Sequence, residues 1–183
     1  MEVEIMDVLK ERGIEVTRDV LLFIYGVKPA CVLSSNKRGL VHVFQSVYPN
    51  IGVQRVPKSG QVIFFQDAAV MKKFIDGGLK VVSREGREYF DYNHGELGKV
   101  LGYPPEACDW FSNLLRRGEL KGTDKCVIDY HGMLFACAVD MVDDCLSWVK
   151  KNRPVPDEIK TEIVVKKYVD GESCILLQES GTE

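Results

Sequence analysis

Cysteine and histidine are the residue types in this chain whose side chains act as nucleophiles, bases or metal ligands. The chain has six cysteines and three histidines: Cys31, Cys108, Cys126, Cys137, Cys145, Cys174, His42, His94 and His131. No two cysteines are spaced as Cys-X-X-Cys, so the sequence predicts neither a zinc ribbon nor a thioredoxin-type redox pair. A chain of 183 residues can bury a core without covalent staples, and we expect its thiols to be reduced.

Cys108 is the first candidate, because it follows two prolines at 104–105 that are typical of the first turn of a helix. The partial positive charge at a helix N-terminus stabilises a thiolate, which is the form that attacks electrophiles and binds metals. His94 opens the preceding predicted helix, and the Gly-Tyr-Pro corner between them could fold it back towards Cys108. The alternative is a packing role, since Cys108 shares a helical face with Phe111 and Leu115.

Cys137 is the second candidate, because it lies just ahead of a helix that we expect Asp140 to cap. His131 is six residues earlier, so an extended segment would place both side chains on one face of a sheet. Cys145 is interpreted as a core residue that packs with Val142, Leu146 and Val149. Three further cysteines lie in apolar, strand-like runs and receive the same interpretation: Cys31, Cys126 and Cys174.

Two kinds of chemistry follow if these residues converge. His94, Cys108, His131 and Cys137 together would form a ligand set suited to zinc or iron. Alternatively, Cys108 or Cys137 would act as a nucleophile, with His94 or His131 as its base and Asp140 as the group that orients the base.

A different function is suggested by residues 31–66, which contain no Asp or Glu. Cations and aromatic rings in one surface could stack bases or hold an anion. The alternative is that the rings belong to the core. The residues concerned are Lys37, Arg38, His42, Arg55 and Lys58, with Phe44, Tyr48, Phe64 and Phe65.

Charge and hydropathy limit the classes of partner. The chain has 24 Lys and Arg against 27 Asp and Glu, a net charge of −3, which argues against nucleic acid as the main partner. No stretch approaches the roughly 20 apolar residues of a membrane helix, and the acidic N-terminus lacks the features of a signal peptide. We therefore expect a cytoplasmic protein without a membrane partner.

The pattern of apolar residues, glycines and prolines predicts a mixture of helices and strands without regular alternation. Helices are expected at 3–12, 67–75, 93–102, 104–117 and 140–151, and strands at 30–34, 40–47, 51–56, 61–66, 79–83, 126–130 and 133–138. Residues 17–25 fit either a helix or a buried strand. We predict a single α+β domain over 1–183 with a largely antiparallel or mixed sheet, a soft boundary near residue 90 and a C-terminal hairpin over 159–178.

One block carries a resemblance. Leu101 to Cys108 reads Leu-Gly-Tyr-Pro-Pro-X-X-Cys, and a Cys-X-X-Asp segment opens a helix from Cys137. Over about residues 90–152 the chain resembles a family of uncharacterised, mostly archaeal proteins that has no established activity. That family shows a paired cysteine where this chain has Ala107, and a further cysteine where it has Met141, which weakens any metal site implied by the resemblance.

The leading hypothesis is a small cytosolic protein with a Cys/His site near Cys108 and Cys137 that binds metal or performs thiol chemistry. Whether it is an enzyme stays open. The alternatives are a non-enzymatic module that binds RNA or an anionic ligand through the acid-free 31–66 surface, and an assembly protein. In the last case the 159–178 hairpin would pair with another chain, including a second copy of this one, through an open edge.

Overall fold

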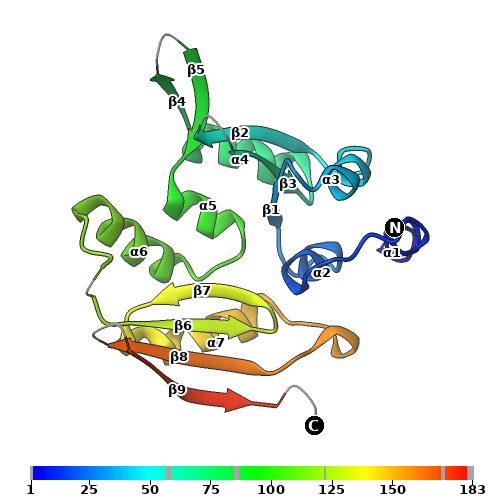
Figure 1. The fold of residues 1–183 in the computed structure, drawn as a ribbon. Coiled ribbons are helices and arrows are strands. Elements are labelled where there is room, and N and C mark those ends of the chain that lie inside the picture. The colour runs from blue at the N-terminus through cyan, green and yellow to red at the C-terminus, as the bar shows by residue number, and fades with distance from the viewer. Residues whose placement is uncertain (1, 57–58, 85–86, 122, 170–171, 181–183) are drawn as a thin grey trace. The chain divides into compact units, whose positions relative to one another are not determined.

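A computed structural model describes residues 2–56, 59–84, 87–121, 123–169 and 172–180. Helices and antiparallel strands are mixed along the described chain, which confirms the predicted α+β class. The contacts divide the chain into two compact units, Met1–Leu101 and Gly102–Glu183, called here the N-terminal and C-terminal units (Figure 1). The single domain over 1–183 stays a prediction.

The N-terminal unit is built on a three-stranded antiparallel sheet in the order β1-β3-β2. Its strands are β1 (Ala30–Ser34), β2 (Asn50–Val56) and β3 (Ser59–Phe65). Three helices precede or interrupt it: α1 (Glu2–Glu11), α2 (Arg18–Ile24) and α3 (Arg38–Gln45). After it come α4 (Ala68–Gly78), a hairpin of β4 (Leu79–Arg84) and β5 (Arg87–Tyr92), and α5 (His94–Val100).

Both faces of this sheet are buried. Phe64 packs in one apolar cluster with residues of α1, α2 and α3, while its neighbour Phe65 packs in a second cluster with residues of α4 and α5. Successive strand residues point to opposite faces, so the helices form a layer on each side of the sheet.

The segment 40–47 was predicted as a strand, and this was wrong, because most of it belongs to α3. Leu40, Val43 and Phe44 are buried at spacings of three and four, whereas His42 is exposed. Over so short a run, a helical stripe and a strand alternation share most of their apolar positions. The open alternative at 17–25 resolves as a helix, and its Thr17 forms no capping side-chain hydrogen bond.

A buried ion pair lies between α2 and β1. Lys28, 1% exposed, pairs with Asp19, whose side chain is 38% exposed. An ammonium removed from water requires its anion, whereas a half-exposed carboxylate can still be solvated. Removing the carboxylate should therefore destabilise the fold more than removing the ammonium.

We expect Asp19→Ala to lower the free energy of unfolding by about 3 kcal/mol, because it leaves the buried ammonium without this carboxylate. Lys28→Met keeps the apolar stem and returns Asp19 to water, so it should cost under about 1 kcal/mol. Urea unfolding of both variants measures the two values. An equal loss for both would contradict the asymmetry.

The C-terminal unit contains a four-stranded antiparallel sheet in the order β7-β6-β8-β9 (Figure 1). The strands are β6 (Lys125–Tyr130), β7 (Met133–Cys137), β8 (Ile163–Val169) and β9 (Glu172–Glu179). The helices are α6 (Pro105–Arg117), α7 (Val142–Asn152) and the short 3-10 turns η1 (Val139–Met141) and η2 (Asp157–Ile159). The predicted 159–178 hairpin is present as β8 and β9, although β8 begins only at Ile163, and its turn at 170–171 lies outside the described residues.

Burial in β6 alternates strictly, with every second residue buried, and β7 follows the same period. One face of the sheet is thus covered and the other is open, as antiparallel sheets permit. On the covered face, Tyr103 stacks on Phe135 of β7 at 5.7 Å between ring centroids. Asp140 does not cap α7 as predicted: it lies within η1, and neither η1 nor α7 has a side-chain cap.

Candidate functional site

The structure separates two of the residues that were predicted to converge. His131 occupies the turn between β6 and β7, whereas Cys137 ends β7 opposite Cys126. From Met133 to Cys137 the strand alone spans roughly 13 Å. His131 has a φ of 55°, so the segment from it to Cys137 is not continuously extended and the parity argument fails. His131 and Cys137 therefore lie at opposite ends of the β6–β7 hairpin and are not brought together as predicted.

His94 and Cys108 fall in different units. His94 begins α5 in the N-terminal unit, where its ring meets that of Tyr92 at 5.4 Å between centroids. Cys108 lies in the first turn of α6, as expected from its prolines, and is buried. Among the residues that the structure describes, no three His, Cys, Asp or Glu side chains are grouped so that they could hold a metal ion. Binding of zinc or iron by the predicted set thus finds no support here.

Three cysteines meet instead on the covered face of the C-terminal sheet. Cys126 and Cys137 are opposite each other on β6 and β7, and both are fully buried. Their side chains point to the same face, where the Cβ atoms of such partners are about 5 Å apart. Cys145, from α7, lies next to Cys137, and each of these thiols shifts the pKa of the other. All six cysteines are free thiols, as expected.

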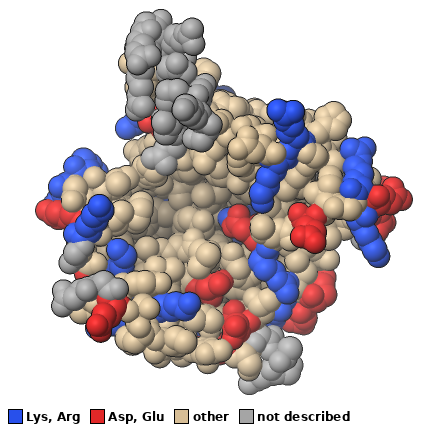
Figure 2. All heavy atoms as spheres, viewed as in Figure 1, with Lys and Arg blue, Asp and Glu red and all other residues tan. Residues whose placement is uncertain are grey.

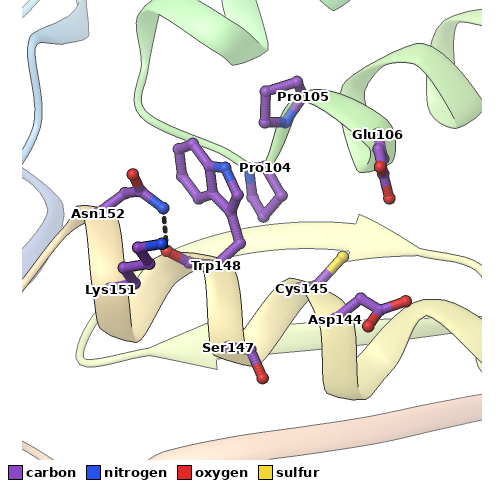
Figure 3. Close-up of a pocket in the computed structure, with 9 residues that line it drawn as sticks. All are labelled: Pro104, Pro105, Glu106, Asp144, Cys145, Ser147, Trp148, Lys151 and Asn152. Carbon is purple, nitrogen blue, oxygen red and sulfur yellow. Dashed lines mark hydrogen bonds between the residues drawn. The ribbon is translucent and has the colours of Figure 1, made fainter.

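Cys145 also lines a cavity of about 650 Å³ between α7 and the start of α6. In Figure 3 the Cys145 sulfur points towards the beginning of α6, with the carboxylates of Glu106 and Asp144 on the same side. Pro104, Pro105 and Trp148 form the apolar wall. The volume lies within the range of small-molecule sites, which run from roughly 300 to 1,000 Å³.

The hydrogen bond between the two thiols shifts their pKa values in opposite directions. Accepting it from Cys137 lowers the pKa of Cys145, and the same bond together with burial raises the pKa of Cys137. Burial, Glu106 and Asp144 act against this and raise the pKa of Cys145. Of the two thiols, Cys145 is therefore the one that ionises more readily, and Cys137 is the one that keeps its proton.

From the sequence, Cys145 was predicted to be a core residue, and Cys108 was predicted to be the reactive or metal-binding cysteine. Cys145 is indeed buried with Leu146 and Val149. What the spacing could not reveal is that the same residue faces both Cys137 and the cavity. A signal was available in its position near the start of a helix, four residues into α7, where a thiolate is favoured.

The acid-free surface at 31–66 is not a platform for stacking bases. The four aromatic rings are buried, with Phe44, Phe64 and Phe65 at 0% exposure and Tyr48 at 6%. Phe44 and Phe64 pack edge to face at 5.4 Å. Lys37, Arg38 and His42 are exposed; Lys58 lies outside the described residues, as does the side chain of Arg55.

The surface shows no dominant charge on the side in view. Figure 2 shows Lys and Arg interspersed with Asp and Glu across that face of the described residues. Such a surface lacks the continuous basic stripe that nucleic-acid binding uses. Among the described residues, no helix is both long and apolar enough to cross a membrane.

Comparison with models of protein families, with curated proteins and with solved structures produced no match. The resemblance over 90–152 therefore stays a prediction. The function of the chain is therefore inferred from its own geometry.

We expect removal of a neighbouring carboxylate to make Cys145 more reactive. Glu106→Gln and Asp144→Asn each delete a negative charge that raises the pKa of Cys145, so both should increase its alkylation rate near pH 7 severalfold. The measurement is iodoacetamide labelling of Cys145 by mass spectrometry across pH. Asp143→Asn is the matched control, since it removes an exposed charge from the same helix turn. Equal acceleration by all three variants would contradict a local effect.

Proposed function

We propose that the C-terminal unit carries a dithiol site that exchanges with small-molecule disulfides, with Cys145 as the attacking thiolate and Cys137 as the resolving thiol. The observation that carries the proposal is that Cys145 lies next to Cys137 and also lines the cavity. It revises the thiol hypothesis drawn from the sequence, because Cys145 takes the place of Cys108.

In this thiol–disulfide exchange, atoms and electrons balance between the two cysteines and the substrate. Cys145 Sγ attacks one sulfur of the disulfide, forms a mixed disulfide and expels the other half as a thiolate. The Cys137 thiol loses its proton to the departing thiolate or to water, and its Sγ attacks the Cys145 sulfur. The second half then leaves, and the protein holds a Cys137–Cys145 disulfide. Two electrons have passed to the substrate, and a thiol reductant must return them.

Burial favours small substrates over protein disulfides. Cys145 is only 2% exposed, so a disulfide in a folded chain could not reach its sulfur. The cavity would admit a small molecule, and Trp148 and the two prolines offer it apolar contact. Lys151 lines the same cavity and could pair with an anionic substituent of the substrate.

The test uses an aromatic disulfide whose released thiol absorbs visible light, in a Cys174→Ala background, because Cys174 is exposed and would react in any case. We expect this protein to release two thiols and retain no adduct. Adding Cys137→Ala should stop the reaction after one thiol with the adduct on Cys145, and adding Cys145→Ala should abolish both steps. Released thiol and intact mass give these outcomes.

Cys126→Ala in the same background is the matched control, since Cys126 is as buried as Cys137 and adjacent to it, and we expect unchanged stoichiometry. Circular dichroism of each variant establishes that it is folded. Reaction of Cys145 only in denaturant, or loss of the second thiol in the Cys126 variant as well, would overturn the proposal.

A second candidate function is self-assembly, favoured by one specific observation. β9 is an edge strand on which Ile175 is 58% and Leu176 is 50% exposed. Antiparallel pairing with a second copy, centred between these two residues, would place Cys174 opposite Leu177 and Ser173 opposite Gln178. Glu172 and Glu179 would meet at the ends, where Lys150 already pairs with Glu179 at 2.9 Å.

We expect the full chain to form a concentration-dependent dimer through this edge, because pairing would bury both apolar side chains and satisfy an open row of backbone groups. Ile175→Lys and Leu176→Lys should each shift it to monomer in sedimentation. Leu134→Lys, an equally exposed apolar residue on the other edge strand, is the control and should not. A full chain that stays monomeric at high concentration would rule the assembly out.

A further inference from the structure

A second cavity in the C-terminal unit, of about 370 Å³, is lined by basic and apolar residues. His131, Lys150 and Lys160 contribute nitrogen atoms to it, Val155 and Ile163 form apolar wall, and Ser180 supplies a hydroxyl. No Asp or Glu is among the described residues that line it. This cavity contains none of the residues of the thiol site.

His131 is held in place at the cavity by its backbone and by one ring nitrogen. His131 and Gly132 have φ values of 55° and 102°, which suits the two-residue turn of a β-hairpin. Nδ1 lies 2.6 Å from the carbonyl oxygen of Thr161, and the Thr161 N–H lies 3.2 Å from the same nitrogen. Two acceptors at 2.6 Å would repel, so we assign the proton to Nδ1, which donates to the carbonyl.

The other ring nitrogen, Nε2, is therefore an acceptor in the neutral ring. His131 is 5% exposed and lines the cavity, and no described residue forms a hydrogen bond with Nε2. Burial lowers the pKa of His131, and Lys160 and Lys150 lower it further, while the Thr161 carbonyl and Asp129 act in the opposite direction. The ring is thus neutral near pH 7.

Two ammonium groups line the cavity, and each is paired with a carboxylate that is not part of the lining. Lys150 pairs with Glu179 at 2.9 Å and Lys160 with Asp157 at 2.5 Å, and each ammonium has further N–H donors. The third carboxylate near His131, that of Asp129, accepts the backbone N–H of Gly132 at 2.7 Å. All three carboxylates are thus engaged, and none lines the cavity.

We propose that this cavity binds a phosphate group that carries a proton, either free phosphate or the monoanion of a small phosphate monoester. The two ammonium groups hold its charge, and Nε2 of His131 accepts the hydrogen bond of its P–O–H group. A fully ionised sulfate has no such proton and meets the lone pair of Nε2 instead. The site therefore discriminates phosphate from sulfate, which equal charge alone would not achieve.

The experiment titrates inorganic phosphate, sulfate and glycerol 2-phosphate into the full chain near pH 7 by calorimetry. We expect saturable binding of phosphate or its ester, about tenfold or more tighter than that of sulfate. Tighter binding of glycerol 2-phosphate than of phosphate identifies an ester as the ligand, and the reverse order identifies free phosphate.

Three variants separate the roles of the residues. His131→Asn keeps a residue that tolerates the positive φ, and it should remove the preference for phosphate over sulfate. Lys150→Gln and Lys160→Gln should weaken both anions alike. Lys166→Gln, which changes an exposed residue of β8 outside the lining of this cavity, is the control. Absence of saturable binding, or binding unchanged in His131→Asn and Lys150→Gln, would overturn the proposal.

Discussion

The covered face of the C-terminal sheet is the constraint on which the candidate site depends. Strict alternation in β6 and β7 places Cys126 and Cys137 on the side that must be buried. α7 supplies Leu146 and Val149 to that core, and one helical turn from Val149 on the same helix lies Cys145. Hydrophobic packing of α7 thus brings the Cys145 sulfur to Cys137 as a consequence of burying larger side chains. The thiol pair is thus a consequence of burying the apolar stripe of α7.

Burial makes this pair different from an exposed dithiol. Water would stabilise two thiolates independently, but here only one charge can be held, and the hydrogen bond decides which sulfur holds it. Glu106 and Asp144 oppose even that single charge. Reactivity at Cys145 is therefore a balance between the donor behind it and the carboxylates at the mouth of the cavity.

The N-terminal unit differs from the C-terminal unit because its sheet is covered on both faces. Strands disfavour acidic residues, above all where both faces of the sheet are buried, and this accounts for the absence of acids within β1 and β3. The buried rings of Phe64 and Phe65 lie on opposite faces of β3. The lack of carboxylates suggested a binding surface, but in these strands it results from burial between two layers of helices.

Local signals in the sequence determined much of the secondary structure. Pro105 opens α6, Gly118 ends it with a φ of 73°, Asp67 caps α4, and Asn93 caps α5, because each of these depends on backbone groups within one turn. The strand predicted at 40–47 failed where two periods share their apolar positions over a short run. Residues whose structure depends on neighbours in the chain were thus predictable.

The site was decided by tertiary structure. The sequence indicated Cys137 and His131 as candidate site residues. In the structure His131 lines the second cavity and Cys137 lies next to Cys145, so the two are not partners of each other as predicted. Strand register places His131 in the turn and Cys137 at the far end of β7, and the packing of α7 places Cys145 next to Cys137. Spacing along the chain determines which face a side chain occupies, whereas which faces meet is set by how the apolar surfaces of separate elements are buried together.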